Sequence, residues 1–428
     1  MKEDEINRAI NKISTNNSMN FLKSDSLYRE YDCLRIASYI LNIESEVKKG
    51  TDFESVTLSI SEDTENSCDI DNLSKTINEI FRFILVKDIE INFHIEKRKK
   101  KSKKYDIPQG NYDYITLFSG GVDSLSGFLV TKEKHSLFPV SVIHGDQPKG
   151  SRIIKNLINA ISELYNERIS HQILYAPKMY RMGYSQVRGL LYSLYGTIFC
   201  NIFKVKNLLI SEIGPTMYQP KFAPYDTITM TTHPYVTQKA KKLSKAIFNE
   251  DFDFITPYED LTKAEAISIS PKKGLFKKSN SCITLAREES EGNCYGCLIR
   301  RLGFITAGVE DIEYLKNVLI DEKVNADMIL SLLRFNSDFL TDYEKIDYAS
   351  RDLIEEYQKK DLFERFALDN FAALYHLKKQ DIHVNTRIDK IYNHTIDSIG
   401  IETLQNRLMA VRENPPNPNF GKRVAFEI

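Results

Sequence analysis

The chain has 428 residues, of which 42% are hydrophobic and 27% charged, and its formal net charge is -1. This length and balance predict two or three ordinary globular domains, and the near-zero charge argues against a protein built to coat nucleic acid. The sequence has no apolar run of about 18–20 residues, as a membrane span needs, and its first residues lack the apolar stretch of a signal peptide. We therefore expect a cytoplasmic protein with no membrane partner.

Residues 1–96 form the first predicted domain, an α/β region of unknown role. Apolar and polar residues alternate in 53–60 and 89–95, as in half-buried strands, and 77–89 fits a helix that leads into the second strand. Residues 97–111 form a predicted basic linker, because seven of the eight residues in 97–104 are cations. A contact for RNA, DNA or an acidic partner is the alternative interpretation of this run.

Residues 112–309 form the predicted central domain, where short apolar runs alternate with helical patterns. We expect strands at 114–118, 139–144, 172–175, 207–212 and 252–255, and helices at 124–132, 153–165, 186–203 and 235–248. This alternation predicts an α/β fold with a parallel, doubly wound sheet and a site at the carboxyl ends of its strands. Residues 310–428 predict a C-terminal helical region, with clear periodicity at 361–377 and a loose tail from 414.

A glycine-containing string follows the first of these central strands and precedes a helix. It consists of Ser119, Gly120, Gly121, Val122, Asp123 and Ser124. Paired glycines let backbone N–H groups approach a phosphate, and the helix N-terminus adds partial positive charge. Ser119 and Ser124 add hydroxyl donors, and the Asp123 carboxylate suits Mg²⁺. An ordinary strand–turn–helix is the alternative, but the complete string favours an ATP site that lacks the Gly-Lys-Ser/Thr of a Walker loop.

The string resembles the Ser-Gly-Gly-x-Asp-Ser signature of PP-loop ATP pyrophosphatases, which implies a sheet of PP-loop (HUP-like) type. The resemblance also implies that ATP is cleaved between its α and β phosphates and that AMP passes to an oxygen of a second substrate. Several further segments resemble the QueC family within this class, whose substrate is 7-carboxy-7-deazaguanine.

Four QueC-like positions lie near strand ends or helix starts. The segment 141–147 loosely resembles a QueC strand end, which implies an ATP contact for His144, and Arg188 stands where QueC proteins carry an arginine near the phosphates. The resemblance places Glu212 and Gly214 in the deazaguanine pocket, where a carboxylate accepts from the ring N–H and the exocyclic amine. Polar residues at strand ends and a solvent-facing arginine are the alternative readings.

The segment 255–265 resembles the family's Thr-Pro…Leu-x-Lys-x-Glu pattern. Thr262 is a candidate helix N-cap and Glu265 stands three residues later, so the two predict a capping box. A capping box accounts for both residues without a catalytic role for either. The resemblance adds a catalytic role for Lys263 beside the pocket, together with Asp123 and Arg188.

Three of the six cysteines, Cys282, Cys294 and Cys297, fall close together, and thiolates at such spacing suit tetrahedral zinc. QueC proteins carry four cysteines here and end in Cys-x-x-Cys-x-x-Arg, which Cys294, Cys297 and Arg300 match. The remaining family cysteine aligns with Glu291. Glu291 or a histidine from elsewhere completes the site, or the metal is absent. A redox Cys-x-x-Cys is less favoured, because no thioredoxin-like βαβ unit precedes it.

The resemblance covers about 112–308, and the long extensions on both sides depart from compact QueC enzymes. This layout resembles QueC-like proteins of the Qat and CBASS anti-phage systems. It implies adenylation of a 7-carboxy-7-deazaguanine-like carboxylate, followed by amide or nitrile formation or by conjugation to an amine of a partner protein from the same defence operon. The alternatives are a PP-loop enzyme that modifies tRNA and a non-catalytic subunit that binds a nucleotide or deazapurine.

Overall fold

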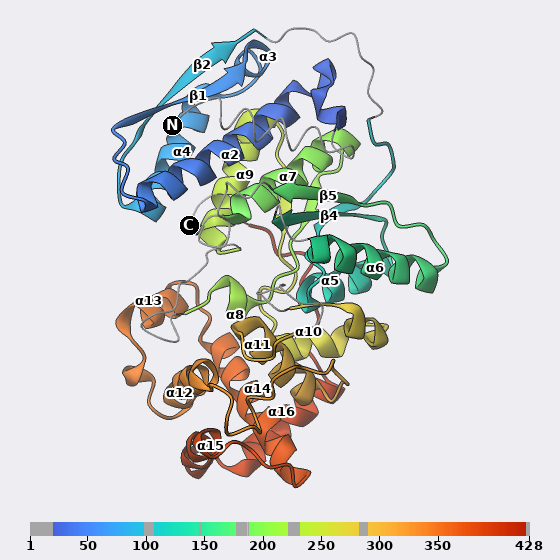
Figure 1. Cartoon of the computed structure of the whole chain (residues 1–428), viewed down its shortest axis with the longest axis vertical. Coiled ribbons are helices and arrows are strands. Elements are labelled where there is room, and N and C mark those ends of the chain that lie inside the picture. The colour runs from blue at the N-terminus through green and yellow to red at the C-terminus, as the bar shows by residue number, and fades with distance from the viewer. Residues whose placement is uncertain are drawn as a thin grey trace.

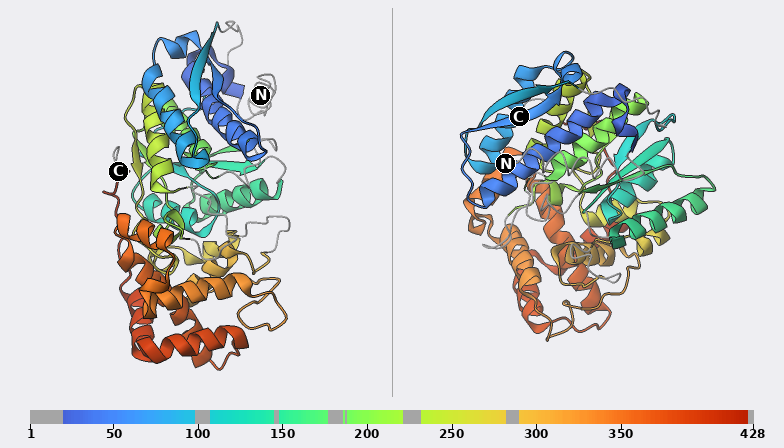
Figure 2. Two further views of the ribbon diagram at one scale, coloured as in Figure 1. Left: turned by 90° about the vertical axis from the view of Figure 1, so that its left-hand side faces the viewer. Right: turned by 45° about the horizontal axis from the view of Figure 1, so that its top comes forward.

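The computed structural model describes residues 20–97, 107–144, 148–176, 186, 188–220, 232–281 and 290–424. Three regions follow one another along the long axis of the molecule, as Figures 1 and 2 show from different directions. The N-terminal region (blue) lies at one end, the sheet region (green) lies in the middle, and the C-terminal helices (orange to red) lie at the other end. Within these described ranges, no helix combines the length and apolarity needed to cross a membrane.

The central region is built on five parallel strands. In spatial order they are β5 (Gln172–Ala176), β4 (Leu137–His144), β3 (Tyr114–Leu117), β6 (Asn207–Leu209) and β7 (Asp253–Ile255). The chain runs outward from β3 through β4 to β5, and then returns to the other side of β3 to form β6 and β7. In sheets whose strand order reverses in this way, ligands commonly bind at the carboxyl ends of the two diverging strands, which here are β3 and β6. The predicted α/β class and parallel sheet are confirmed.

Helices cover both faces of this sheet. Apolar residues of α7 (Arg188–Phe203) and α9 (Pro234–Phe248) share one core with strand residues such as Ile115 and Leu208. Apolar residues of α5 (Val122–Lys132) and α6 (Pro148–Tyr165) share a second core with Ile143 and Ile173, which lie on the opposite face.

The predicted central elements occur where the sequence places them, with shifts at their ends. The helix predicted at 153–165 begins five residues earlier, at Pro148, and β6 ends at Leu209 rather than at 212. Beyond it, the Ile210 N–H donates to the carbonyl oxygen of Ile255 at 2.9 Å, and the chain then leaves the sheet to form the short helix α8 (Gly214–Met217). Residues 210–213 therefore lie between the carboxyl end of β6 and α8.

The N-terminal region packs on the sheet region and is not separated from it. Its elements are η1 (Asn20–Lys23), η2 (Asp25–Leu27), α2 (Tyr28–Lys48), β1 (Ser55–Ser61), α3 (Glu62–Glu65), α4 (Ile70–Leu85) and β2 (Glu90–Glu96). β1 and β2 form a two-stranded parallel sheet, as the alternating patterns predict. α2 packs on α7 and α4 packs on α9, so one apolar core runs through both regions.

The C-terminal region is helical, as predicted. It contains α11 (Tyr295–Ala307), α12 (Asp327–Thr341), η6 (Tyr343–Lys345), α13 (Tyr348–Glu356), α14 (Lys360–Lys379), α15 (Thr386–Ile399) and α16 (Ile401–Glu413). These helices share their own apolar core. The short elements α10 (Lys263–Ile269) and η5 (Lys273–Lys278) join this region to the sheet.

The prediction of a loose C-terminal tail is wrong. After α16 the chain returns to the sheet, where Arg423 pairs with Ile255 in an antiparallel bridge. The Val424 N–H donates to the Phe254 carbonyl at 2.9 Å, and the Thr256 N–H donates to the Lys422 carbonyl at 3.3 Å. The edge strand β7 supplies backbone groups that need partners, and these bonds bind the tail to it.

Candidate functional site

The glycine loop joins β3 to α5 at the carboxyl edge of the sheet. Gly120 has a φ of +76°, a left-handed conformation that glycine adopts without steric cost. Gly121 is the N-cap of α5, and its N–H donates to the hydroxyl of Ser119 at 3.3 Å. The Ser119 and Ser124 hydroxyl oxygens lie 3.1 Å apart. The loop thus places two hydroxyls beside a helix N-terminus, as an anion site requires.

A second segment, from η5 to Asn280, flanks the loop. The Asn280 N–H donates to the Gly120 carbonyl at 3.0 Å, and the Asn280 carbonyl oxygen would lie 3.6 Å from a β-carbon on Gly121. Arg300 fixes this segment from α11, because its guanidinium donates to the Ser279 carbonyl and hydroxyl at 3.0 and 2.9 Å and to the Phe276 carbonyl at 2.9 Å. Arg300 is fully buried and also pairs with Asp311 at 2.8 Å. Its position gives it a structural role.

Three charged residues meet behind the loop. The Lys263 Nζ lies 2.5 Å from both carboxylate oxygens of Asp123, and these two side chains are only about a tenth exposed. The carboxyl group of Glu212 forms a hydrogen bond with that of Asp123. Burial raises the pKa of Glu212 well above its usual value, and the neighbouring Asp123 charge raises it further.

The start of α10 holds Lys263 in this cluster. Thr262 is the N-cap, and the predicted capping box is confirmed: the Glu265 N–H donates to the Thr262 hydroxyl at 3.3 Å, and the Thr262 N–H donates to the Glu265 carboxylate at 2.9 Å. A β-carbon on Gly303 of α11 would lie 2.8 Å from the Lys263 Cγ. The missing side chain at 303 therefore leaves room for the aliphatic part of Lys263.

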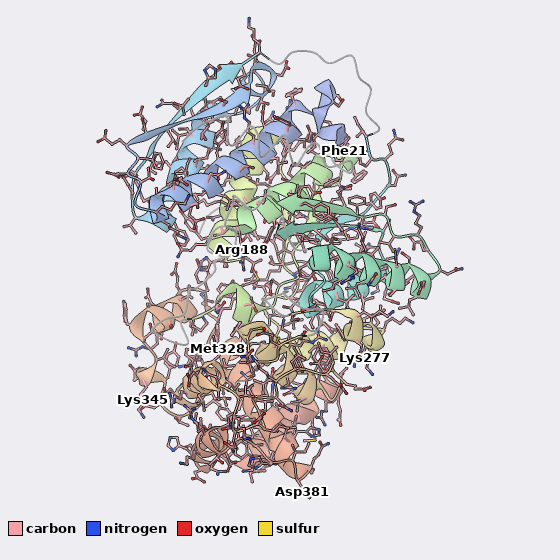
Figure 3. All side chains as sticks on the ribbon, in the orientation of Figure 1. Phe21, Arg188, Lys277, Met328, Lys345 and Asp381 are labelled. Carbon is pink, nitrogen blue, oxygen red and sulfur yellow. The ribbon has the colours of Figure 1, made fainter. Side chains whose placement is uncertain are left out.

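The other predicted ATP and substrate residues have different surroundings. Arg188 begins α7, and Figure 3 shows it in the middle of the molecule, between the N-terminal half and the C-terminal helices. A β-carbon on Gly214 would lie 2.2 Å from the Glu259 carbonyl oxygen and 2.3 Å from the Leu362 Cδ2, which gives this glycine a packing role. His144 ends β4, and its side chain lies outside the described part of the chain.

Two of the predicted zinc ligands lie together. Cys294 is the N-cap of α11, and its Sγ lies 3.3 Å from the Sγ of the buried Cys297. A helix N-terminus stabilises thiolates, the form that binds zinc. Cys282 lies outside the described residues. Among the residues that are described, no three potential metal ligands gather, and the predicted role of Glu291 as a further ligand stays a prediction. The two sulfurs fit half of a tetrahedral zinc site, which stays a prediction.

Sequence reasoning missed several residues that shape the site. Asn280 and Ser279 carry no motif, and their contact with the loop depends on a backbone bond and on Arg300. Gly303 offered a weak signal, because a glycine inside a helical pattern commonly marks close packing. The hydrogen bond between Glu212 and Asp123 had no local signal, because the two residues follow different strands.

No protein-family model, curated protein or solved structure matches this chain.

Proposed function

We propose that this protein is a PP-loop ATP pyrophosphatase that adenylates a carboxylate substrate and releases pyrophosphate. One observation carries the proposal: the loop 119–124 lies where the strand order reverses, and the buried Lys263–Asp123–Glu212 cluster lies directly behind it. A nucleotide phosphate and a charged metal ion need this combination of backbone donors, carboxylate and ammonium.

The residues of the loop fit the phosphates of ATP. The first N–H groups of α5 lack partners within the helix, and the hydroxyls of Ser119 and Ser124 lie beside them. Asp123 is the carboxylate that would hold Mg²⁺, which neutralises phosphate charge when bound. Lys263 orients this carboxylate through both of its oxygens and adds a cation of its own. Catalysis then rests on positioning and charge neutralisation.

The reaction proposed is adenylation followed by transfer. A carboxylate oxygen of the substrate attacks the α-phosphorus of ATP, the bond to the bridging α–β oxygen breaks, and pyrophosphate leaves. An amine then attacks the acyl carbon of the acyl-adenylate, AMP leaves, and the amine loses a proton. The product is an amide. If ammonia is the amine, a second activation of the amide oxygen followed by its elimination gives a nitrile.

We assign Glu212 to the substrate. Its carboxyl group lies at the carboxyl edge of the sheet beside Asp123, on the segment that follows β6. A deazaguanine ring carries polar groups along one edge, and the Glu212 carboxyl group, whose pKa burial raises, can form hydrogen bonds with that edge. The proposed substrate is therefore a 7-carboxy-7-deazaguanine-like acid. The amine is ammonia or an amine of a partner protein, and the long extensions favour a role in anti-phage defence.

Nucleotide product analysis tests this proposal. Purified protein is mixed with Mg²⁺·ATP and 7-carboxy-7-deazaguanine, with and without ammonium, and the products are separated by ion-exchange chromatography. We expect AMP and pyrophosphate only when the deazaguanine is present, and neither with Asp123→Asn. Asp113→Asn is the matched control, because Asp113 precedes the other end of β3 and accepts the Ser136 N–H. Release of ADP, or no cleavage, would overturn the proposal.

A further inference from the structure

Two arginines from the C-terminal helices bind one buried carboxylate at the start of α10. Glu265 has no exposed surface, and the Arg365 Nη1 on α14 lies 2.5 Å from both of its carboxylate oxygens. The Arg407 Nη2 on α16 donates to the same carboxylate at 2.7 Å, and the Arg407 Nε donates to Asp369 at 2.7 Å. We call Glu265, Arg365 and Arg407 the arginine clamp.

The clamp acts on the residue that caps α10. Glu265 also accepts the Thr262 N–H at 2.9 Å, so the two guanidinium groups hold the carboxylate that closes the capping box. The Arg365 Nη2 donates to the Asp260 carbonyl at 2.9 Å, which fixes the chain just before the cap. Lys263 is the first residue of α10, immediately after Thr262. Its backbone is therefore held on both sides.

The charges in the clamp determine the ionisation state of Glu265. Burial alone would raise the pKa of Glu265, but the Arg407 and Arg365 charges outweigh that effect and lower it, so the carboxylate stays ionised. A buried carboxylate is costly unless it is paired and hydrogen-bonded, and here the Arg365 and Arg407 guanidinium groups and the Thr262 N–H all bind it. Neither arginine is close to the glycine loop in sequence.

We infer that Arg365 and Arg407 are positioning residues for Lys263, through Glu265 and the capping box. The inference rests on the proposed function, in which Lys263 orients Asp123 at the nucleotide. The C-terminal helices then have a definite role, because their docking sets where the Lys263 ammonium lies. Loosening the clamp frees the first turn of α10 and separates Lys263 from Asp123, without removing any group that touches ATP.

The test measures the position of Lys263 without using catalysis. Wild-type protein is treated briefly with acetic anhydride, and acetylation of Lys263 is measured by mass spectrometry relative to Lys239. Lys239 is a suitable reference because it is buried on α9, away from the clamp, and its Nζ lies 2.5 Å from a carboxylate oxygen of Glu79. We expect Arg365→Met to raise the Lys263/Lys239 ratio roughly fivefold, as local opening exposes the amine.

Two further variants test whether the change in the Lys263/Lys239 ratio comes from the clamp. Glu265→Gln keeps the size and the capping hydrogen bond but removes the charge that both arginines bind, and it should raise the same ratio. Arg412→Met is the matched control, because Arg412 also lies on α16 but donates to the Thr306 and Ile305 carbonyls. It should leave the ratio unchanged. An unchanged ratio in both clamp variants, or an equal rise with Arg412→Met, would overturn the inference.

Activity separates this inference from the proposed function. If the wild type forms AMP, the clamp variants should lose kcat roughly tenfold or more, because small misplacement of a catalytic group is costly, while Arg412→Met keeps it. If the wild type forms no AMP but the labelling ratios change as expected, the proposed function fails and the clamp still positions Lys263. If AMP forms and the labelling does not change, the clamp inference fails alone.

Discussion

A β-carbon placed on Gly127 would lie 2.0 Å from the Oγ of Ser211 and 2.3 Å from its Cβ. Gly127 lies in α5, which the glycine loop begins, and Ser211 lies just after β6, next to Glu212. This close approach brings α5 against the segment that carries Glu212. It is the reason that the Asp123 and Glu212 carboxyl groups, each at the end of a different strand, can share a hydrogen bond.

Gly127→Ala should destabilise the protein. Alanine favours a helix over glycine by about 1 kcal/mol, but the added methyl overlaps two atoms of Ser211, and such overpacking costs about 1–3 kcal/mol. Urea unfolding should show a net loss, and Ser211→Gly in the same chain should restore most of it. Gly274→Ala is the control, because a β-carbon there has no neighbour within 4 Å. Equal stability of Gly127→Ala and wild type would contradict the close packing.

Lys263→Met should abolish most ATP cleavage. The ammonium pairs with both oxygens of Asp123, and loss of one preorganised charge at a reacting phosphate costs roughly 10²–10³ in kcat. The measurement is the rate of AMP formation under saturating Mg²⁺·ATP. Lys239→Met also removes a buried lysine–glutamate pair but lies on α9 away from the loop, so it should lower stability and leave the rate unchanged. A similar rate loss in both variants would point to general destabilisation.

Arg300→Met should weaken both the fold and the nucleotide site. It removes one donor each from the Ser279 and Phe276 carbonyls and leaves the Asp311 carboxylate without its arginine partner, and breaking such a buried pair costs about 3–5 kcal/mol. Because Asn280 contacts Gly120, the Kd for ATP should rise as well, which isothermal titration calorimetry can measure. Arg301→Met is the control, since the neighbouring arginine bonds Asn317. Unchanged ATP binding by a folded Arg300→Met protein would remove Arg300 from the site.

Mild acid should destabilise the protein through His233. Burial lowers the pKa of His233 to about 4, and its Nδ1 accepts the Tyr235 N–H as the N-cap of α9, which requires neutral imidazole. In the unfolded chain the imidazole of His233 takes up a proton near pH 6.5. The stabilisation that depends on neutral His233 is therefore fully present above pH 6.5 and is lost as the pH falls toward 4. We expect about 2 kcal/mol to be lost between pH 8 and 5.

Chemical unfolding at several pH values can measure this effect as a difference between two proteins. His233→Asn keeps a capping acceptor but does not titrate, so the gap between wild type and variant should change over this range. If the free energies of unfolding of wild type and variant change in parallel with pH, His233 is not the source of the pH dependence.

Zinc content tests the cysteine cluster independently of activity. If Cys294 and Cys297 bind zinc with Cys282, purified protein should contain metal by plasma mass spectrometry, and Cys297→Ser should lose it. Chelation should also lower the melting temperature of the wild type. Cys68→Ser is the control, because Cys68 is a half-buried free thiol in the N-terminal region. Metal-free wild-type protein prepared without chelators would argue against the zinc site.

Local patterns in the sequence determined much of this architecture. Short apolar runs located the five central strands, the glycine string located the strand–turn–helix, and Thr262 with Glu265 located the start of α10. Each of these signals depends on hydrogen bonds or periodicity within a few residues, so it survives in the sequence alone. The helix α2 was missed because its residues are buried on nearly all sides, which removes the one-sided apolar stripe that marks a surface helix.

Only the tertiary structure decided which distant residues meet. Lys263 and Asp123 are 140 positions apart, and Arg407 and Glu265 are 142 positions apart. The return of the C-terminal tail to β7 was likewise invisible in a proline-rich segment. The sequence by itself placed the glycine loop and its helix. The partners of Asp123 and Glu265 depend on how separate helices dock, because a charge finds its counter-charge only after the apolar faces between them have packed.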